Sequence, residues 1–132
     1  MTTEVEILKV NETDRHEGTL TFGIKGRQYD AFYWGYNFKP GDKVEVTLTQ
    51  LEYPLTWDTI FGENKRREKK IEKSKTKDWT YHCYGTIQSV KPVVANFGDF
   101  QLDLGGWTND PKVVGEHIYW TVDRLDIQRA DY

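Results

Sequence analysis

The residues best suited to binding chemistry form an aromatic cluster between positions 29 and 38. This stretch reads Tyr-Asp-Ala-Phe-Tyr-Trp-Gly-Tyr-Asn-Phe, and its rings fall on both faces of an extended chain. Because only one face of a surface strand can enter a core, some of these rings are expected to stay exposed. Exposed rings can stack on bases or anchor a protein partner. We therefore predict that Trp34 and Tyr36 are partner-binding anchors.

A second candidate is a run of positive charge between residues 65 and 77. It contains eight basic residues and two acidic ones, a local charge of +6, whereas the rest of the chain carries −9. Ile71 is the only apolar residue in the run, so a helix here would have almost no face to dock on a core. The run is interpreted as a mobile hairpin arm or a frayed helix. The predicted electrostatic contacts are Lys65, Arg66, Arg67, Lys69 and Lys70.

No spacing of residues predicts catalysis. The sequence has no Walker loop, no dinucleotide-binding glycine motif, no nucleophile elbow and no His-Glu-x-x-His zinc motif. His82 precedes Cys83, but neighbours along a strand point to opposite faces, so the two cannot share a metal ion without a kink. Cys83 falls on the inward face and is expected to be a small buried side chain. We therefore expect no catalytic site, no metal and no cofactor.

Cysteine content and the first residues bear on the cellular compartment. One cysteine cannot form an intramolecular disulfide, and the acidic start of the chain differs from a signal peptide, which is basic and then apolar. No apolar run is long enough to cross a bilayer. These features predict a cytoplasmic protein without a membrane partner.

The elements that position the candidate residues are predicted to be strands. Val, Ile and Thr number 31 and, with 19 aromatic residues, suit a pleated surface, whereas Ala, Leu and Met number only 12. Apolar residues alternate from Val44 to Leu48 and from Ile118 to Val122. They then move to Leu125 and Ile127, which predicts a β-bulge near residues 123–124. The segment from Val5 to Val10 shows the same change of parity.

Two parts of the chain resemble each other. Residues 41–52 align without gaps to residues 115–126, with Gly, Thr and Leu identical. Gly18–Leu20 also matches Gly85–Ile87, and the turn around Trp34 loosely matches the one around Trp107. These matches suggest two related β-units, 4–53 and 79–127, joined by an insertion at 54–78.

The length of 132 residues is typical of one domain, so we predict a single domain over residues 1–132. Units of three or four strands need partners to cover their apolar faces. The predicted fold is all-β and mainly antiparallel, a small barrel or sandwich of about seven strands. The basic insertion is expected to be partly helical or mobile, with Trp57, Ile60 and Phe61 anchoring its start at helical spacing.

Two resemblances bear on function. The small acidic body, rich in Tyr and Trp and without catalytic motifs, resembles in general character the immunity proteins that neutralise bacterial toxins, which implies a protein partner of basic charge. The long insertion lies between β-units, and its place in the strand order resembles that of the helix that follows the third strand of an OB-fold. This resemblance implies that the protein binds single-stranded nucleic acid.

The leading hypothesis is therefore a non-enzymatic, macromolecule-binding β-protein whose partner is another protein, as in immunity proteins. Binding of single-stranded nucleic acid by an OB-like protein is one alternative. A barrel that encloses a small apolar ligand is another. Outward Tyr and Trp side chains could also form a homodimer face.

Overall fold

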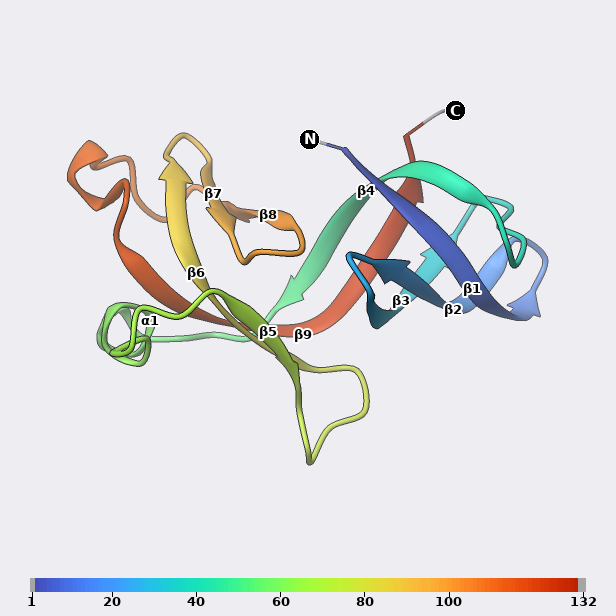
Figure 1. Ribbon diagram of the computed structural model, residues 1–132. Helices are drawn as coiled ribbons and strands as arrows, with labels where there is room; N and C mark the ends of the chain where they lie inside the picture. Colours follow the sequence, from blue (N-terminus) through green and yellow to red (C-terminus); the bar gives the residue numbers. More distant parts are fainter. Residues whose placement is uncertain (1, 131–132) are drawn as a thin grey trace. The chain divides into compact units, whose positions relative to one another are not determined.

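The computed structural model describes residues 2–130, which form β-strands with one short α-helix (Figure 1). Within the described residues, hydrogen bonding joins nine strands into one sheet, and the last strand, β9, links its two parts. The sequence predicted about seven strands. The β3–β9 pair is parallel, and the pairs β1–β2, β1–β4, β2–β3, β5–β6, β6–β7, β6–β9 and β7–β8 are antiparallel. The predicted all-β, mainly antiparallel class is confirmed.

The elements are β1 (Thr3–Asp14), β2 (Glu17–Ile24), β3 (Arg27–Trp34), β4 (Lys43–Glu52), α1 (Trp57–Gly62), β5 (Lys70–Lys73), β6 (Tyr81–Ser89), β7 (Val93–Asn96), β8 (Gln101–Gly105), a 3-10 turn (Pro111–Val113) and β9 (His117–Arg129).

The chain divides into two compact units. Unit 1 comprises residues 1–51 and 124–132, and unit 2 comprises residues 52–123. Strand β9 runs through both, and the boundary falls where the sequence predicted a change of parity. The buried positions of β9 run from Ile118 to Val122 in steps of two, with Thr121 also buried, and continue at Leu125 and Ile127. One strand therefore contributes apolar side chains to two cores.

Unit 1 is a partial ring of strands. Strands β3, β2, β1 and β4 lie in that order, and the second half of β9 follows β4, where the Ala130 amide donates to the Glu45 carbonyl at 2.9 Å. A parallel bridge between Phe32 and Asp126 then joins β9 to β3. The β1–β2 register shifts between Ile7 and Lys9, which confirms the predicted parity change in the first segment. The largest fully buried side chains of this core are Tyr33, Phe22, Ile7, Leu125, Ile127 and Val46.

Unit 2 contains β9, β6, β7 and β8 in that order, with β5 paired to the first half of β6. Helix α1 begins at the N-cap residue Thr56, whose hydroxyl accepts a hydrogen bond from the Thr59 amide at 3.3 Å. Ile60 of α1 is buried, and the Trp57 ring lies 5.4 Å from that of Trp107. The Phe61 ring lies 6.0 Å from that of Trp107. The predicted anchoring of the insertion by Trp57, Ile60 and Phe61 is thereby confirmed.

The two units share one topology, the Greek key. In unit 1 three hairpin-connected strands, β1 to β3, are followed by β4, which returns beside β1. In unit 2 the same order links β6, β7, β8 and β9, so β6 stands in the place of β1 (Figure 1). The match of Gly18–Leu20 with Gly85–Ile87 is therefore wrong as a pairing of equivalent strands, because it aligns β2 with β6.

The match of residues 41–52 with 115–126 pairs strands that are equivalent. The Gly41 amide donates to the Ile7 carbonyl at 2.7 Å, and the Gly115 amide donates to the Ile87 carbonyl at 2.8 Å. Both glycines have φ of +92°, a conformation that side chains with a Cβ rarely adopt. The same turn thus precedes the fourth strand of each unit, while a common origin of the units stays a prediction.

Gly85 provides a test of strand packing in unit 2. It is buried on β6, and a Cβ at this position would overlap the carbonyl oxygen of Asn96 on β7. Gly85→Ala must push these backbones apart, so we expect the free energy of unfolding to fall by about 2–3 kcal/mol, as in overpacked cores. The measurement is urea denaturation followed by circular dichroism. Gly106→Ala is the matched control, because a Cβ there meets nothing within 4 Å. Equal stability of the two variants would contradict this packing.

Candidate functional site

A groove of about 520 Å³ lies on the half-buried face of β6 and β9 in unit 2. Tyr84 of β6 is in register with Tyr119 of β9, and His82 is in register with Thr121. These four side chains share one face because they alternate with Cys83 and Trp120, which are buried. We call this the aromatic groove, and it is lined by Tyr53, Leu55, Thr59, Glu63, Ser74, Thr76, Lys77, Thr80, His82, Tyr84, Tyr119 and Thr121.

Hydrogen bonds fix the centre of the aromatic groove. The Thr121 hydroxyl donates to the Tyr119 oxygen at 2.9 Å, and His82 Nδ1 lies 2.6 Å from the same oxygen. The His82 and Tyr119 rings stack at a centroid distance of 6.0 Å, and the Tyr84 ring lies 5.2 Å from that of Tyr119. Burial raises the pKa of Tyr84, and the nearby Tyr119 raises it further. The phenol of Tyr84 is therefore neutral at physiological pH.

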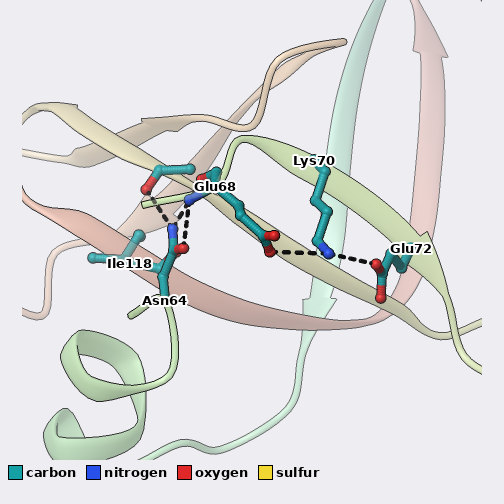
Figure 2. Close-up of polar contacts among 6 residues, drawn as sticks. Asn64, Glu68, Lys70, Glu72 and Ile118 are labelled. Carbon is teal, nitrogen blue, oxygen red and sulfur yellow. Dashed lines mark hydrogen bonds and ion pairs between the residues drawn. The ribbon is translucent and has the colours of Figure 1, made fainter. Parts of the chain in front are cut away.

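Cations lie over two of the rings. Lys77 Nζ lies 4.9 Å from the centre of the Tyr53 ring, within the range of a cation–π interaction. Lys70 Nζ lies 5.0 Å from the centre of the Tyr84 ring. Lys70 is also held by the carboxylates of Glu72 at 2.7 Å and Glu68 at 2.9 Å (Figure 2). Hydrogen bonds to these two carboxylates raise the pKa of Lys70 above its ordinary value.

Asn64 attaches the basic run to the sheet of unit 2. Its side chain is 5% exposed, and its amide donates to the carbonyls of Glu68 at 2.9 Å and Ile118 at 3.1 Å. Its carbonyl oxygen accepts from the Glu68 amide at 2.7 Å (Figure 2). A third donor contact reaches the Gly85 carbonyl at 3.5 Å. One buried amide therefore closes the turn before β5 and ties it to β6 and β9.

The predicted site residues fall in different units. Trp34 and Tyr36 belong to unit 1, where Trp34 is 61% exposed at the end of β3 and Tyr36 is half-buried. The basic candidates belong to unit 2, and the structure places Lys70 in β5 with its ion pairs. The other four are exposed in the turn before β5 and form no ion pair within residues 2–130: Lys65, Arg66, Arg67 and Lys69.

The basic run forms a turn and a strand. Strand β5 pairs antiparallel with β6 from Lys70 to Lys73, which agrees with the hairpin interpretation, while the helical part of the insertion is α1. Ile71 faces Cys83 across this pair. Short edge strands rich in lysine are a common way to end a sheet without inviting further pairing.

Sequence reasoning missed the rings of the aromatic groove. His82 is half-buried, and Cys83 is fully buried as expected, which raises the pKa of its thiol and keeps it unreactive. Tyr84 and Tyr119 carry a usable signal, because both are aromatic residues on the outward parity of a strand. Only the register of β6 with β9 brings the two together.

No protein-family model, curated protein or solved structure matches the chain, so its site is interpreted from its own geometry. Within residues 2–130, no three His, Cys, Asp or Glu side chains are grouped as metal ligands. None of the helical segments in the same range has the length and apolar character of a membrane span.

The ion pairs of Lys70 predict how Glu72 titrates. The hydrogen bond from Lys70 holds the pKa of the Glu72 carboxyl below its ordinary value of 4.5. A lowered pKa in the folded state stabilises the fold above pH 4.5, and this contribution is lost as the pH falls through the folded value. Carboxyl NMR titration should place the Glu72 midpoint below 4.5 and return it upward in Lys70→Met. An unchanged midpoint in Lys70→Met would contradict the ion pair, and Lys112→Met is the control.

Asn64→Ala should release the turn that carries the basic run. The substitution leaves the Glu68 amide without its acceptor, and an unsatisfied buried group costs about 1–3 kcal/mol. Hydrogen exchange should then accelerate at residues 64–73 more than in β7 or β8. Asn109→Ala, at an exposed position of unit 2, is the matched control. Unaltered exchange at residues 64–73 would show that Asn64 does not hold the turn.

Proposed function

We propose that the aromatic groove of unit 2 binds single-stranded nucleic acid. The observation that supports this most directly is the placement of three tyrosine rings and a lysine ammonium along one groove. Bases stack on aromatic side chains for about 1–3 kcal/mol each, whatever their identity. Tyr53 is 44% exposed at the edge of the groove, so it offers a ring face to an incoming base.

The charges beside the groove suit a phosphate backbone. Lys77 lines the groove, and Lys65, Arg66, Arg67 and Lys69 supply exposed cations in the same unit. Glu68 and Glu72 are engaged by Lys70, which leaves Glu63 as the carboxylate that lines the groove. Charges farther than about 8 Å are largely screened at physiological ionic strength. The acidic residues that lie beyond this distance therefore do not prevent Lys77 from contacting a phosphate.

The hydroxyl groups along the groove add hydrogen-bonding capacity. Ser74, Thr76, Thr80 and Thr121 line it together with the tyrosine hydroxyls. Hydroxyls donate and accept, so they can meet sugar or phosphate oxygens without fixing a base sequence. The proposed binding is therefore tolerant of sequence and strongly dependent on salt.

A protein partner is the second candidate, and one observation in unit 1 favours it. Trp34 is 61% exposed, and tryptophan is among the residues that most often dominate the binding energy of protein interfaces. This surface is separate in the chain from the aromatic groove, so the two candidates can be tested with different variants.

Binding of a short fluorescein-labelled oligothymidylate, followed by anisotropy, tests the nucleic-acid proposal. Tyr119→Ala should weaken the affinity by about 5- to 150-fold, the loss of one stacked base. Lys77→Met should weaken it as well and lower the slope of log Kd against log salt concentration by about 0.7, the loss of one phosphate contact.

Lys112→Met is the matched control for charge, because Lys112 is exposed in the 3-10 turn and lies outside the groove residues. It should bind as the unmodified chain does. Absence of binding at low salt, or equal affinities of Tyr119→Ala and the unmodified chain, would refute the proposal. Circular dichroism confirms that each variant is folded.

A further inference from the structure

We propose that unit 1 carries a second binding site, at Trp34, for a lysine- or arginine-bearing segment of a protein partner. The site is a pocket of about 330 Å³ on the outward face of β2 and β3. It is independent of the aromatic groove, which lies wholly in unit 2. The pocket is lined by Thr13, Glu17, Gly18, Thr19, Phe32, Tyr33, Trp34 and Arg124.

Two residues of this pocket, a ring and a cation, are already in contact, and a carboxylate beside the pocket holds the cation. The Arg124 guanidinium lies 4.5 Å from the centre of the Phe32 ring. Asp126 holds the same guanidinium through two hydrogen bonds, of 2.8 and 3.2 Å. The ring attracts the cation through its electron-rich face, and the carboxylate orients the guanidinium. The Asp126 carboxylate offsets the positive charge of the Arg124 guanidinium, so Arg124 attracts an incoming anion only weakly.

The neighbouring positions supply a ring and a carboxylate without a cation. Trp34 follows Phe32 by two residues and therefore shares its face of β3, and it is in register with Glu17 of β2. Trp34 is 61% exposed. The Glu17 carboxylate is exposed and has no hydrogen-bond or ion-pair partner within residues 2–130. A cation from outside would form with Trp34 and Glu17 a second arrangement of the kind that Phe32, Arg124 and Asp126 already make.

The surrounding charge selects a cationic partner. Asp14 is exposed on the β1–β2 hairpin and is in register with Glu17, so the two carboxylates share one face, while the exposed Arg15 lies in the turn between the two strands. Tryptophan is the strongest cation–π partner among the aromatic side chains. The carboxylates of Asp14 and Glu17 attract a lysine or arginine and repel phosphates at short range. A basic protein segment therefore fits this face better than nucleic acid does.

An arginine-glycine repeat peptide serves as the probe, with a glutamate-glycine peptide as its negative counterpart. Titration with the basic peptide should shift the indole N–H signal of Trp34 in NMR spectra, and the acidic peptide should leave it in place. Trp34→Ala should weaken peptide binding by about 2- to 5-fold, the contribution of an exposed cation–π contact. Glu17→Gln should weaken it further and reduce its salt dependence.

Trp57→Ala is the matched control, because Trp57 is 53% exposed in unit 2. It should bind the peptide as the unmodified chain does, and Trp34→Ala should keep its affinity for oligothymidylate. No shift of the Trp34 signal, or equal peptide affinity of Trp34→Ala and the unmodified chain, would overturn the proposal. A Trp34 shift caused by oligothymidylate and not by the peptide would also overturn it, in favour of nucleic acid at this site.

Discussion

The structure depends on one strand serving two hydrophobic cores. Successive side chains of a strand point to opposite faces, so β9 can fill both cores only by changing parity along its length. Val122 is its last inward apolar residue in unit 2, and Leu125 is the first in unit 1. The same switch decides which side chains face outward. Before it they include Tyr119 of the aromatic groove, and after it they include Arg124 beside Phe32. Both candidate sites are therefore consequences of how β9 buries its apolar residues.

A single buried amide fixes the turn from which the basic run enters the sheet. The run has too few apolar side chains to dock by hydrophobic burial, so its position must come from hydrogen bonds. Asn64 supplies them, because its side chain bonds to both the amide and the carbonyl of Glu68 while also reaching the Ile118 carbonyl. From that point β5 pairs with β6, and Lys70 comes to lie over the Tyr84 ring. The hydrogen bonds of the Asn64 side chain thus help to place Lys70 at the edge of the aromatic groove.

The alternation of apolar residues along the sequence predicted most of the fold and little of the candidate site. It predicted the strands, the parity changes in β1 and β9 and the burial of Cys83, because each depends only on neighbours along the chain. The aromatic groove depends on β6 lying in register with β9, which is distant in sequence, and local patterns do not determine such registers. The hairpin interpretation of the basic run did not say where β5 lies, because Lys-Ile-Glu-Lys carries no strand signal of its own and pairs because β6 offers a free edge. Asn64 looked like an ordinary loop residue, since its burial exists only in the folded unit.

The formal charge of the chain obscures the electrostatics of its surfaces. A net charge of −3 describes an almost balanced protein, yet Lys70 and Lys77 lie over rings of the aromatic groove, and the carboxylates of Asp14 and Glu17 share the face of Trp34. Because salt screens charges beyond about 8 Å, an approaching partner experiences the local cluster and not the sum. Acidity of the whole chain therefore gives no reason to exclude an anionic partner from the groove, just as the basic run gives none to exclude a cation at Trp34. The two surfaces differ in the sign of charge beside their rings, and that difference is what would make them select different partners.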